Sequence, residues 1–540
     1  MTGLLFEADA RAALRRGVDA VADAARVTLG PSGRRVVIGG ADGPVVTADG
    51  ATVAAAVELA DPYANLGAAL VREAAERTRA AVGDGTTTTI VLTQALVAAG
   101  MRAVAAGAHP AALRRGMDAA VAAVVAHLDG AARPMSGEQE MALVAAAAAG
   151  DREWGEVIAR ACAKTGPQGA VTVETAHVPG VEAEFTDGFV LDRGFLSPLM
   201  MTHPEQGEAV LENAYVLLHP GTIESLDALL PVLDRVAATG RPLLVVAGGL
   251  RQDVLAALVM NRLRGTLLCA AVEAPALGDR RRTHLEDLAA LTGGQVVTPE
   301  KGLPLERVTP AELGDVARVV VTRTTTTVTG GAGAPEAVRG RVAHLERSLR
   351  TATDAFDREV LEQRLARLTG GLCVLKVGAD SDTEGAERRQ RITGAVAAAR
   401  AAAAEGTVPG GGTALLRAAA ALEDGLALAG DERTGVLTVR AALAAPLRRI
   451  AAAAGMDGAH LAARAAMAPA GHGWDAATDR WCDLAAAGVL DPVRVPRTAL
   501  HNAASVAGLL LTAGGLVVNH RPADPDAVSW RRRGHGHHHA

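Results

Sequence analysis

Gly83-Asp84-Gly85-Thr86-Thr87-Thr88-Thr89 runs directly into the apolar segment Ile90-Val91-Leu92. Glycines on both sides of an acid let the backbone approach a ligand closely. A helix that begins at the threonines presents free N–H groups at the positive end of its dipole, and the carboxylate can hold a divalent cation. The stretch therefore predicts a phosphate and metal site, although a capped helix start without a ligand uses the same residue types. It is not a Walker loop, because the Gly-Lys-Ser/Thr ending is missing.

Glycine-containing segments accompany this stretch on both sides. They are Thr28-Leu29-Gly30-Pro31-Ser32-Gly33-Arg34, Thr47-Ala48-Asp49-Gly50-Ala51, Val408-Pro409-Gly410-Gly411-Gly412-Thr413 and Gly488-Val489-Leu490-Asp491-Pro492. In this order the segments resemble the nucleotide-binding segments of the GroEL-type (group I) chaperonins. The resemblance extends from about Phe6 to about Val518, which is most of the chain.

The composition indicates a soluble protein with several domains. Hydrophobic residues make up 49% of the 540 residues but aromatic residues only 2%, so Ala, Val and Leu must build the core. The net charge of −6, with both signs interspersed, argues against a nucleic-acid partner. The four cysteines form no CxxC pair, and the sequence has no recognisable signal peptide or membrane-spanning run. We therefore expect a cytoplasmic protein without a membrane partner.

Hydrophobic periodicity predicts the main elements. Helical spacing covers residues 66–79, 110–128, 152–164, 226–237, 252–264 and 386–405. Strand-like runs cover residues 170–174, 243–247 and 319–322. The predicted fold is multidomain and mainly α, with an α/β central domain.

The resemblance implies three discontinuous domains, which periodicity alone does not show. An equatorial ATP-binding domain would comprise residues 1–130 and 405–540. An intermediate hinge domain would comprise residues 131–186 and 373–404, and residues 187–372 would form an apical domain. Both chain ends would then meet in one domain, which a single nucleotide could move.

The resemblance also implies a site for ATP and Mg²⁺, with K⁺ as a further candidate ion. Asp84 would hold Mg²⁺, and Asp49 would lie close to the γ-phosphate and the attacking water, which makes both candidate catalytic residues. The other implied nucleotide contacts are Thr28, Leu29, Gly30, Pro31, Gly85, Thr86, Thr87, Thr88, Gly411, Asp475, Ala476, Ala477 and Asp491. Phosphoryl transfer depends mostly on positioning and charge neutralisation, so these groups form an adequate core.

Several positions depart from the family's pattern, and one of them bears directly on hydrolysis. The resembled chaperonins carry an aspartate on a long helix of the intermediate domain, and Gly394 stands at the matching position. Residue 390 is Gln, and the nearest upstream carboxylate, Glu387, lies about two turns away. A helical glycine costs about 1 kcal/mol relative to alanine, so stability does not explain this choice. Hydrolysis would be strongly reduced, or Asp49 and Asp84 would suffice for a slower reaction.

Apolar stripes run along the two central helices at 226–237 and 252–264. Such stripes commonly face a domain core. In the resembled family, however, two apical helices and a loop form a groove for unfolded polypeptides or a GroES-type co-chaperonin. The matching positions are Phe195, Leu199, Met200, Leu230, Leu233, Leu255, Val259 and Met260. The resemblance further implies a homo-oligomer of two stacked seven-membered rings.

The C-terminal end contains His535, His537, His538 and His539 after three arginines. Imidazoles can chelate Ni²⁺, Zn²⁺ or Cu²⁺, whereas a solvated tail without metal would have the same composition. The end resembles the His-rich ends of some divergent actinobacterial paralogues in the family. Three functions stay open: an ATP-driven folding chaperonin, a non-cycling holdase or ring scaffold that binds ATP, and a metal-handling or nucleoid-associated role through the tail.

Overall fold

The structure is a computed structural model. It covers residues 2–40, 43–166, 169–176, 180–186, 188–276, 278–352, 354–369, 371–379, 381–423 and 425–519. The chain divides into two compact units, of which one comprises residues 1–159 and 390–540 and the other residues 160–389. The first unit is therefore built from both ends of the chain.

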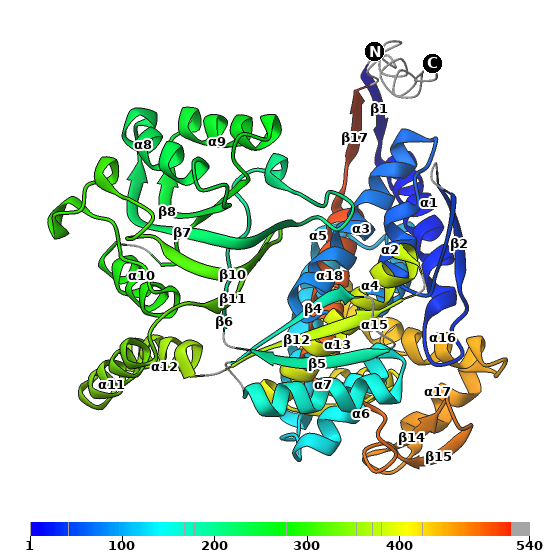
Figure 1. Cartoon of the computed structure of the whole chain (residues 1–540). Coiled ribbons are helices and arrows are strands. Elements are labelled where there is room, and N and C mark those ends of the chain that lie inside the picture. Colours follow the sequence, from blue (N-terminus) through cyan, green and yellow to red (C-terminus); the bar gives the residue numbers. More distant parts are fainter. Residues whose placement is uncertain are drawn as a thin grey trace, which may run out of the picture. The chain divides into compact units, whose positions relative to one another are not determined.

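The first unit is mainly helical (Figure 1). Its helices are α1 (Glu7–Ala25), α2 (Gly50–Ala56), α3 (Pro62–Val82), α4 (Thr86–Ala105), α5 (Pro110–Ala131), α6 (Glu138–Ala149), α14 (Thr413–Ala418), α15 (Gly430–Ala442), α16 (Ala445–Ala453), α17 (Gly458–Met467) and α18 (Arg494–Thr512), with short 3₁₀ turns η1 (Arg26–Thr28), η5 (Ala419–Leu422) and η6 (Gly425–Ala427). Two more helices, α7 (Arg152–Thr165) and α13 (Asp382–Glu405), begin in one unit and end in the other.

Glycines let the helices of this unit approach closely. A Cβ atom at Gly17 of α1 would overlap the carbonyl oxygen of Ala64 on α3. A Cβ atom at Gly116 of α5 would overlap the carbonyl oxygen of Glu432, which belongs to α15. Because the backbones lie this close, buried alanines, valines and leucines can fill the space between the helices. A core with few aromatic residues is built in this way.

The strands of this unit form antiparallel pairs. The pairs are β1 (Thr2–Phe6) with β17 (Gly515–Asn519), β2 (Val36–Gly40) with β3 (Gly43–Thr47), β13 (Thr407–Pro409) with β16 (Leu490–Pro492), and β14 (His472–Asp475) with β15 (Arg480–Asp483). The β1–β17 pair joins segments more than 500 residues apart, as the residues Thr2 and Asn519 lie opposite each other. Both ends of the described chain therefore meet in one unit.

The second unit contains a six-stranded sheet of order β6-β11-β10-β7-β8-β9. Its strands are β6 (Gly188–Leu191), β7 (Ala209–Ile223), β8 (Leu243–Leu250), β9 (Cys269–Glu273), β10 (Gly314–Val321) and β11 (Thr326–Gly331). Along β8, Leu243 and Val245 pack with helices α8 (Leu226–Ala237) and α9 (Gln252–Arg264), whereas Leu244 and Val246 pack with α10 (Gly278–Thr292). The helices thus cover both faces of this sheet (Figure 1).

A second sheet of this unit has the order β4-β12-β5. Its strands are β4 (Ala170–Ala176), β5 (Val181–Thr186) and β12 (Leu372–Gly378), with β12 parallel to β4 and antiparallel to β5. The remaining helical elements of the unit are α11 (Pro335–Thr351), α12 (Ala355–Thr369) and the 3₁₀ turns η2 (Pro198–Met200), η3 (Pro299–Lys301) and η4 (Leu305–Arg307).

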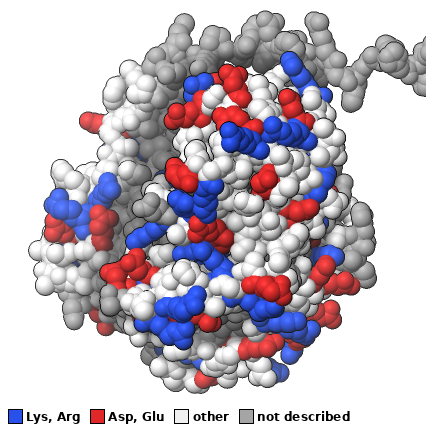
Figure 2. Space-filling view, turned by 60° about the vertical axis from the view of Figure 1, so that its left-hand side comes forward, with Lys and Arg blue, Asp and Glu red and all other residues white. Residues whose placement is uncertain are grey.

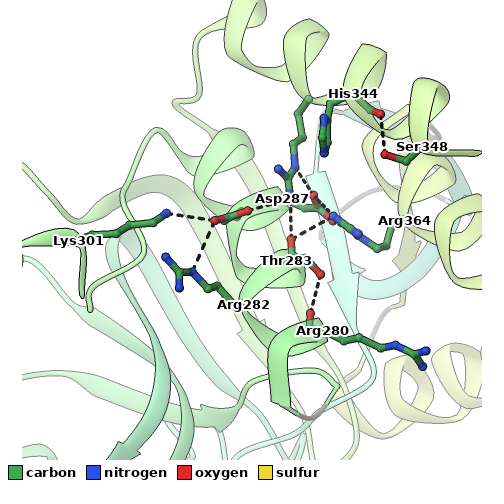
Figure 3. A network of polar contacts seen from close by, with 10 residues as sticks. Arg280, Arg282, Thr283, Asp287, Lys301, His344, Ser348 and Arg364 are labelled. Carbon is green, nitrogen blue, oxygen red and sulfur yellow. Dashed lines mark hydrogen bonds and ion pairs between the residues drawn. The ribbon is translucent and has the colours of Figure 1, made fainter. Parts of the chain in front are cut away.

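A buried carboxylate joins α10 to α11 and α12 (Figure 3). Asp287 on α10 accepts from Arg364 Nε at 2.7 Å and from Arg341 Nε at 2.6 Å. Both guanidinium groups also donate to the carbonyl oxygen of Thr283, at 3.2 and 2.9 Å. Asp287 and Arg364 are buried, so hydrogen bonds to both charged groups compensate for their lost hydration.

The elements predicted from periodicity are confirmed: helices and strands occur in every predicted range, although most extend further than expected. The multidomain, mainly helical fold class with an α/β central part is also confirmed. The three-domain division stays a prediction. Charges of both signs are interspersed on the face shown in Figure 2.

The α4 helix alone among the described helices is long and apolar enough to cross a membrane, judged by length and composition. Its residues Ile90, Leu92 and Leu96 are fully buried in the core of the first unit. This burial is typical of the central helix of a packed domain.

Candidate functional site

The turn between α3 and α4 has the predicted helix start. Gly83 ends α3 with a φ of 77°, and Gly85 precedes α4 with a φ of 80°, which are left-handed conformations suited to glycine. The N–H of Gly85 donates to Asp84 Oδ1 at 2.6 Å and so fixes this carboxylate beside the helix start. The first turn of the 20-residue helix α4 presents free N–H groups and favours an anion.

Hydroxyl groups from separate segments gather at this helix start. Thr28 Oγ1 lies 3.5 Å from Thr87 Oγ1. A Cβ atom at Gly50 would overlap Thr87 Oγ1 and would lie 3.2 Å from Thr28 Oγ1, so only glycine leaves room there. The chain continues from Thr28 through Gly30, with a φ of 86°, and the exposed Pro31. The segments that the sequence predicts to bind phosphate therefore lie close together.

A chain of polar groups supports the helix start from within the core. Asn502 Nδ2 donates to Thr78 Oγ1 at 2.9 Å, and Thr78 Oγ1 lies 2.9 Å from Thr89 Oγ1. Thr89 Oγ1 in turn donates to the carbonyl oxygen of Gly85 at 3.0 Å. The sequence analysis missed Thr78 and Asn502, because single polar residues inside helices form no recognisable motif.

The carboxylates of Asp49, Asp84 and Asp491 influence one another. Loss of hydration raises the pKa of Asp84, and the charge of Asp49 raises it further, while the Gly85 N–H opposes the rise. Loss of hydration also raises the pKa of Asp491 to about 7, with a further contribution from Asp84. Among the described residues, no Lys or Arg takes part in either shift. A cation bound here would favour the ionised form of both groups.

Segments from the C-terminal part of the chain complete the site. The β13–β16 pairing brings the glycine-rich segment to Asp491, since a Cβ atom at Gly410 would lie 3.1 Å from Asp491 Oδ1. Gly411 and Gly412 follow, with φ values of 64° and 76°. Thr413 Oγ1 is buried and has no hydrogen-bond partner within the described part of the chain. A ligand could satisfy this polar atom.

The predicted purine contacts lie at an apolar cluster. Leu29 and Ala476, which are far apart in sequence, both pack against the buried residues around Trp474. Asp475 holds the turn that carries Ala476, because its Oδ1 accepts the N–H of Ala477 at 2.9 Å. The Asp475 side chain is thus engaged in its own turn, and Leu29 and Ala476 contribute apolar surface beside it.

The helix α13 lies directly against the Gly83 turn. A Cβ atom at Gly394 would lie 2.5 Å from the carbonyl oxygen of Gly83, and a Cβ atom at Gly83 would lie 2.6 Å from Ala397 Cβ. One helical turn before Gly394, Gln390 Nε2 donates to Asp49 Oδ2 at 3.0 Å. Gln390 is not an acid, and nothing in its local sequence predicts a contact with Asp49.

The donor set fits Mg²⁺ bound together with phosphate groups. Mg²⁺ commonly takes one or two carboxylates, with waters and substrate phosphate oxygens completing its octahedron. Asp84 supplies such a carboxylate beside the hydroxyls of Thr86–Thr88. The described residues contain no group of three or more His, Cys, Asp or Glu that could hold a metal by itself. The predicted tail ligands His535, His537, His538 and His539 lie outside the described residues.

The eight predicted polypeptide contacts differ in exposure. Three of them are buried in the core beneath α8 and α9, so in this conformation they belong to the core and not to a surface: Met200, Leu233 and Val259. Two pack partly buried against the cores of this unit: Phe195 and Leu255. Three are exposed: Leu199, Leu230 and Met260. Leu263, at the end of α9, is also exposed and extends the apolar surface.

Comparison with known families agrees with this arrangement. The model of the TCP-1/cpn60 chaperonin family matches residues 21–521. The match includes every segment that forms the site, from Thr28 to Asp491, and covers far more than half of the chain. The chain therefore belongs to the TCP-1/cpn60 chaperonin family.

Proposed function

We propose that this protein is an ATP-dependent chaperonin that binds non-native polypeptides and assists their folding inside a ring closed by a co-chaperonin lid. Its family supports a protein-folding chaperone role, and members of the family are in general ATPases that use Mg²⁺. The observation that supports ATP binding is that the carboxylates of Asp49, Asp84 and Asp491 meet near the start of α4, which glycines precede.

The proposed nucleotide contacts follow from the chemistry of each group. The N–H groups and hydroxyls of the first turn of α4 would bind the phosphates together with Thr28. Asp84 would hold Mg²⁺, which supplies neutralising charge at the phosphate oxygens when it is bound. The apolar surface at Leu29 and Ala476 would receive the purine, and Asp491 the ribose.

Asp49 is the residue proposed to orient the attacking water. Its Oδ2 accepts the backbone N–H of Thr52 at 2.7 Å and the Thr52 hydroxyl at 2.6 Å. Among the described residues, the bonds to this side chain all go to Oδ2, so Oδ1 can accept a hydrogen bond from water. The water oxygen attacks the γ-phosphorus, the bond to the bridging oxygen of ADP breaks, and Asp49 takes up the water proton.

The proposed polypeptide surface comprises the exposed side chains of Leu199, Leu230, Met260 and Leu263. Burial of apolar side chains is not directional, so such a surface can bind many unfolded segments or the apolar loop of a lid protein. Met260 adds a flexible side chain that adapts to different partners.

Exposed strand edges support the proposed ring. Among the described residues, the β1–β17 and β2–β3 pairs are two-stranded sheets whose outer edges pair with no further strand, and Phe6 and Val37 are 63% and 66% exposed. Free edges invite pairing with another chain. Contact between two different surfaces of neighbouring copies is head-to-tail, and such contacts generate a ring when the rotation between copies closes. Two stacked seven-membered rings are the assembly that the group I resemblance implies.

A non-cycling holdase or ring scaffold that binds ATP with little turnover is the second candidate. The observation that favours it is Gly394, which supplies no carboxylate where the resembled chaperonins have one. Loss of a group that orients water commonly lowers a rate about 100-fold or more.

A refolding assay separates the two candidates. A chemically denatured model enzyme is diluted into the purified protein with a GroES-type lid, and aggregation and recovered activity are measured with and without ATP. A folding chaperonin suppresses aggregation and gives recovery that requires ATP. Suppression without ATP-dependent recovery indicates the holdase, and neither effect would contradict both candidates.

A further inference from the structure

We propose that Gln390 is a positioning residue for ATP hydrolysis: its side-chain amide holds Asp49 Oδ2, so that Asp49 Oδ1 faces the attacking water. The inference rests on the proposed ATPase function, to which it adds a residue of this chain. It also gives a function to the segment of α13 that borders the site.

The geometry at Asp49 carries the inference. Gln390 Nε2 lies 3.0 Å from Asp49 Oδ2, and the same oxygen accepts the N–H and the hydroxyl of Thr52. Three donors on one oxygen fix the rotation of the carboxylate about its Cβ–Cγ bond. Thr52 belongs to the helix that Asp49 caps, so within the described part of the chain Gln390 is the residue that ties the carboxylate to a distant segment.

The close packing at Gly394 lets Gln390 reach Asp49. Gln390 and Gly394 are one turn apart on α13 and therefore lie on the same face of this helix. Since a Cβ atom at Gly394 would lie 2.5 Å from the carbonyl oxygen of Gly83, a larger residue would push this face of α13 away from the site. Glycine at 394 therefore permits the close approach of α13 to the Gly83 turn, and glutamine at 390 can then donate to Asp49.

An amide suits this position better than a second carboxylate would. The side chain at residue 390 directly contacts a carboxylate oxygen, Asp49 Oδ2. A further acid at residue 390 would add repulsion, whereas the amide donates a hydrogen bond without charge. A misplacement of a reacting group by about 1 Å can lower a rate about 100-fold, so fixing Asp49 has a large effect on turnover.

The test compares Gln390→Met with a matched control, Gln94→Met. Methionine keeps the length and helix propensity of glutamine but removes the amide. Gln94 likewise lies on a helix and donates to two carboxylates, Asp19 at 2.9 Å and Asp23 at 3.0 Å, away from the site. A second variant, Gln390→Glu, keeps the shape of the side chain and replaces the donor by a charge.

ATP turnover and ATP affinity are measured for each assembled protein. The proposal expects kcat to fall at least about tenfold in Gln390→Met and Gln390→Glu, with ATP Kd unchanged within about twofold. The control keeps wild-type kcat. Unchanged kcat in Gln390→Met, or an equal loss in Gln94→Met, would overturn the proposal.

Hydrogen exchange of the nucleotide-free proteins gives a readout that does not depend on turnover. Without Gln390, Asp49 is held less firmly, so the Thr52 amide should exchange faster in Gln390→Met but not in Gln94→Met. If wild-type protein binds ATP without hydrolysing it, the proposed ATPase function fails, and the exchange result alone then decides the positioning. Equal exchange in all proteins would overturn it.

Discussion

At Gly394, α13 lies against the Gly83 turn with no side chain in between. The packing gives a steric reason for glycine at this position, in addition to the loss of a carboxylate. A Cβ atom 2.5 Å from a carbonyl oxygen forces a backbone shift, and such a shift costs about 2 kcal/mol in a packed region. Restoring an acid at residue 394 would therefore also move α13.

Gly394→Asp is predicted to lower the thermal unfolding midpoint and not to accelerate ATP hydrolysis. The added side chain separates α13 from the Gly83 turn and so removes the Gln390–Asp49 hydrogen bond. Calorimetry and steady-state ATPase assays check both effects. Gly340→Asp is the control, since a Cβ atom at that helical glycine has nothing within 4 Å. A stable Gly394→Asp protein with faster turnover would contradict this packing argument.

At the scale of elements, small residues determine how closely helices pack in the first unit. Gly116 on α5 and Gly435 on α15 face each other's helix backbones, and a Cβ atom on either would overlap a carbonyl oxygen. The interface therefore tolerates no added methyl group, even though alanine is the better helix former.

Gly116→Ala is predicted to destabilise the protein by about 3 kcal/mol, because α5 and α15 must move apart. Gly130→Ala, on the same helix, is the matched control, since a Cβ atom there meets nothing within 4 Å. The control should be neutral or slightly stabilising because alanine has the higher helix propensity. Thermal unfolding of the two variants checks this, and equal midpoints would show that the α5–α15 contact is not tight.

The second unit should respond to acid through α10. Loss of hydration, together with Arg364 and Arg367, lowers the pKa of His284 from 6.5 to about 4. Between pH 6.5 and pH 4 the unfolded chain binds a proton that the folded chain does not, so stability falls as the pH falls through this window.

His284→Gln should remove this part of the pH dependence. The full pKa change corresponds to about 3 kcal/mol at pH 4. Because His284 is only partly buried, the stability difference between wild type and variant is expected to shift by about 2 kcal/mol against the wild type from pH 7 to pH 4. Unfolding midpoints of the two proteins across this range provide the measurement. A difference that stays constant with pH would show that His284 keeps an ordinary pKa.

At the scale of the whole molecule, assembly and polypeptide binding are proposed to use different surfaces. Val37→Lys places a charge on the exposed β2–β3 hairpin and is predicted to reduce ring assembly, measured by light scattering. Leu263→Lys places the same charge at the end of α9 and should keep assembly but weaken binding of unfolded polypeptide. Loss of assembly in both variants, or in neither, would contradict this separation.

Local sequence patterns predicted most helices and strands but not the pairing of the two chain ends. Apolar stripes identified α8 and α9, because period and length are properties of the segment itself. The β1–β17 pairing depends on segments at opposite ends of the chain, which no local window contains. Periodicity likewise does not tell whether a stripe is covered, and the family resemblance, which placed Met200, Leu233 and Val259 in a groove, does not tell it either.

Some residues of the site could likewise be predicted from the sequence, and others could not. Glycines at Gly83 and Gly85 have a recognisable conformational role, so the helix start could be predicted from sequence. Gln390 could not, because its role depends on how closely α13 approaches Asp49, and that distance is set by glycine packing between distant segments.

Turnover of bound ATP tests the central claim most directly. ATP hydrolysis by the assembled wild-type protein is measured with Mg²⁺ beside Asp49→Asn, with ATP affinity determined for both. We expect measurable wild-type turnover that falls at least about 100-fold in Asp49→Asn while ATP still binds. Equal turnover in the two proteins, or failure of the wild type to bind ATP, would contradict it.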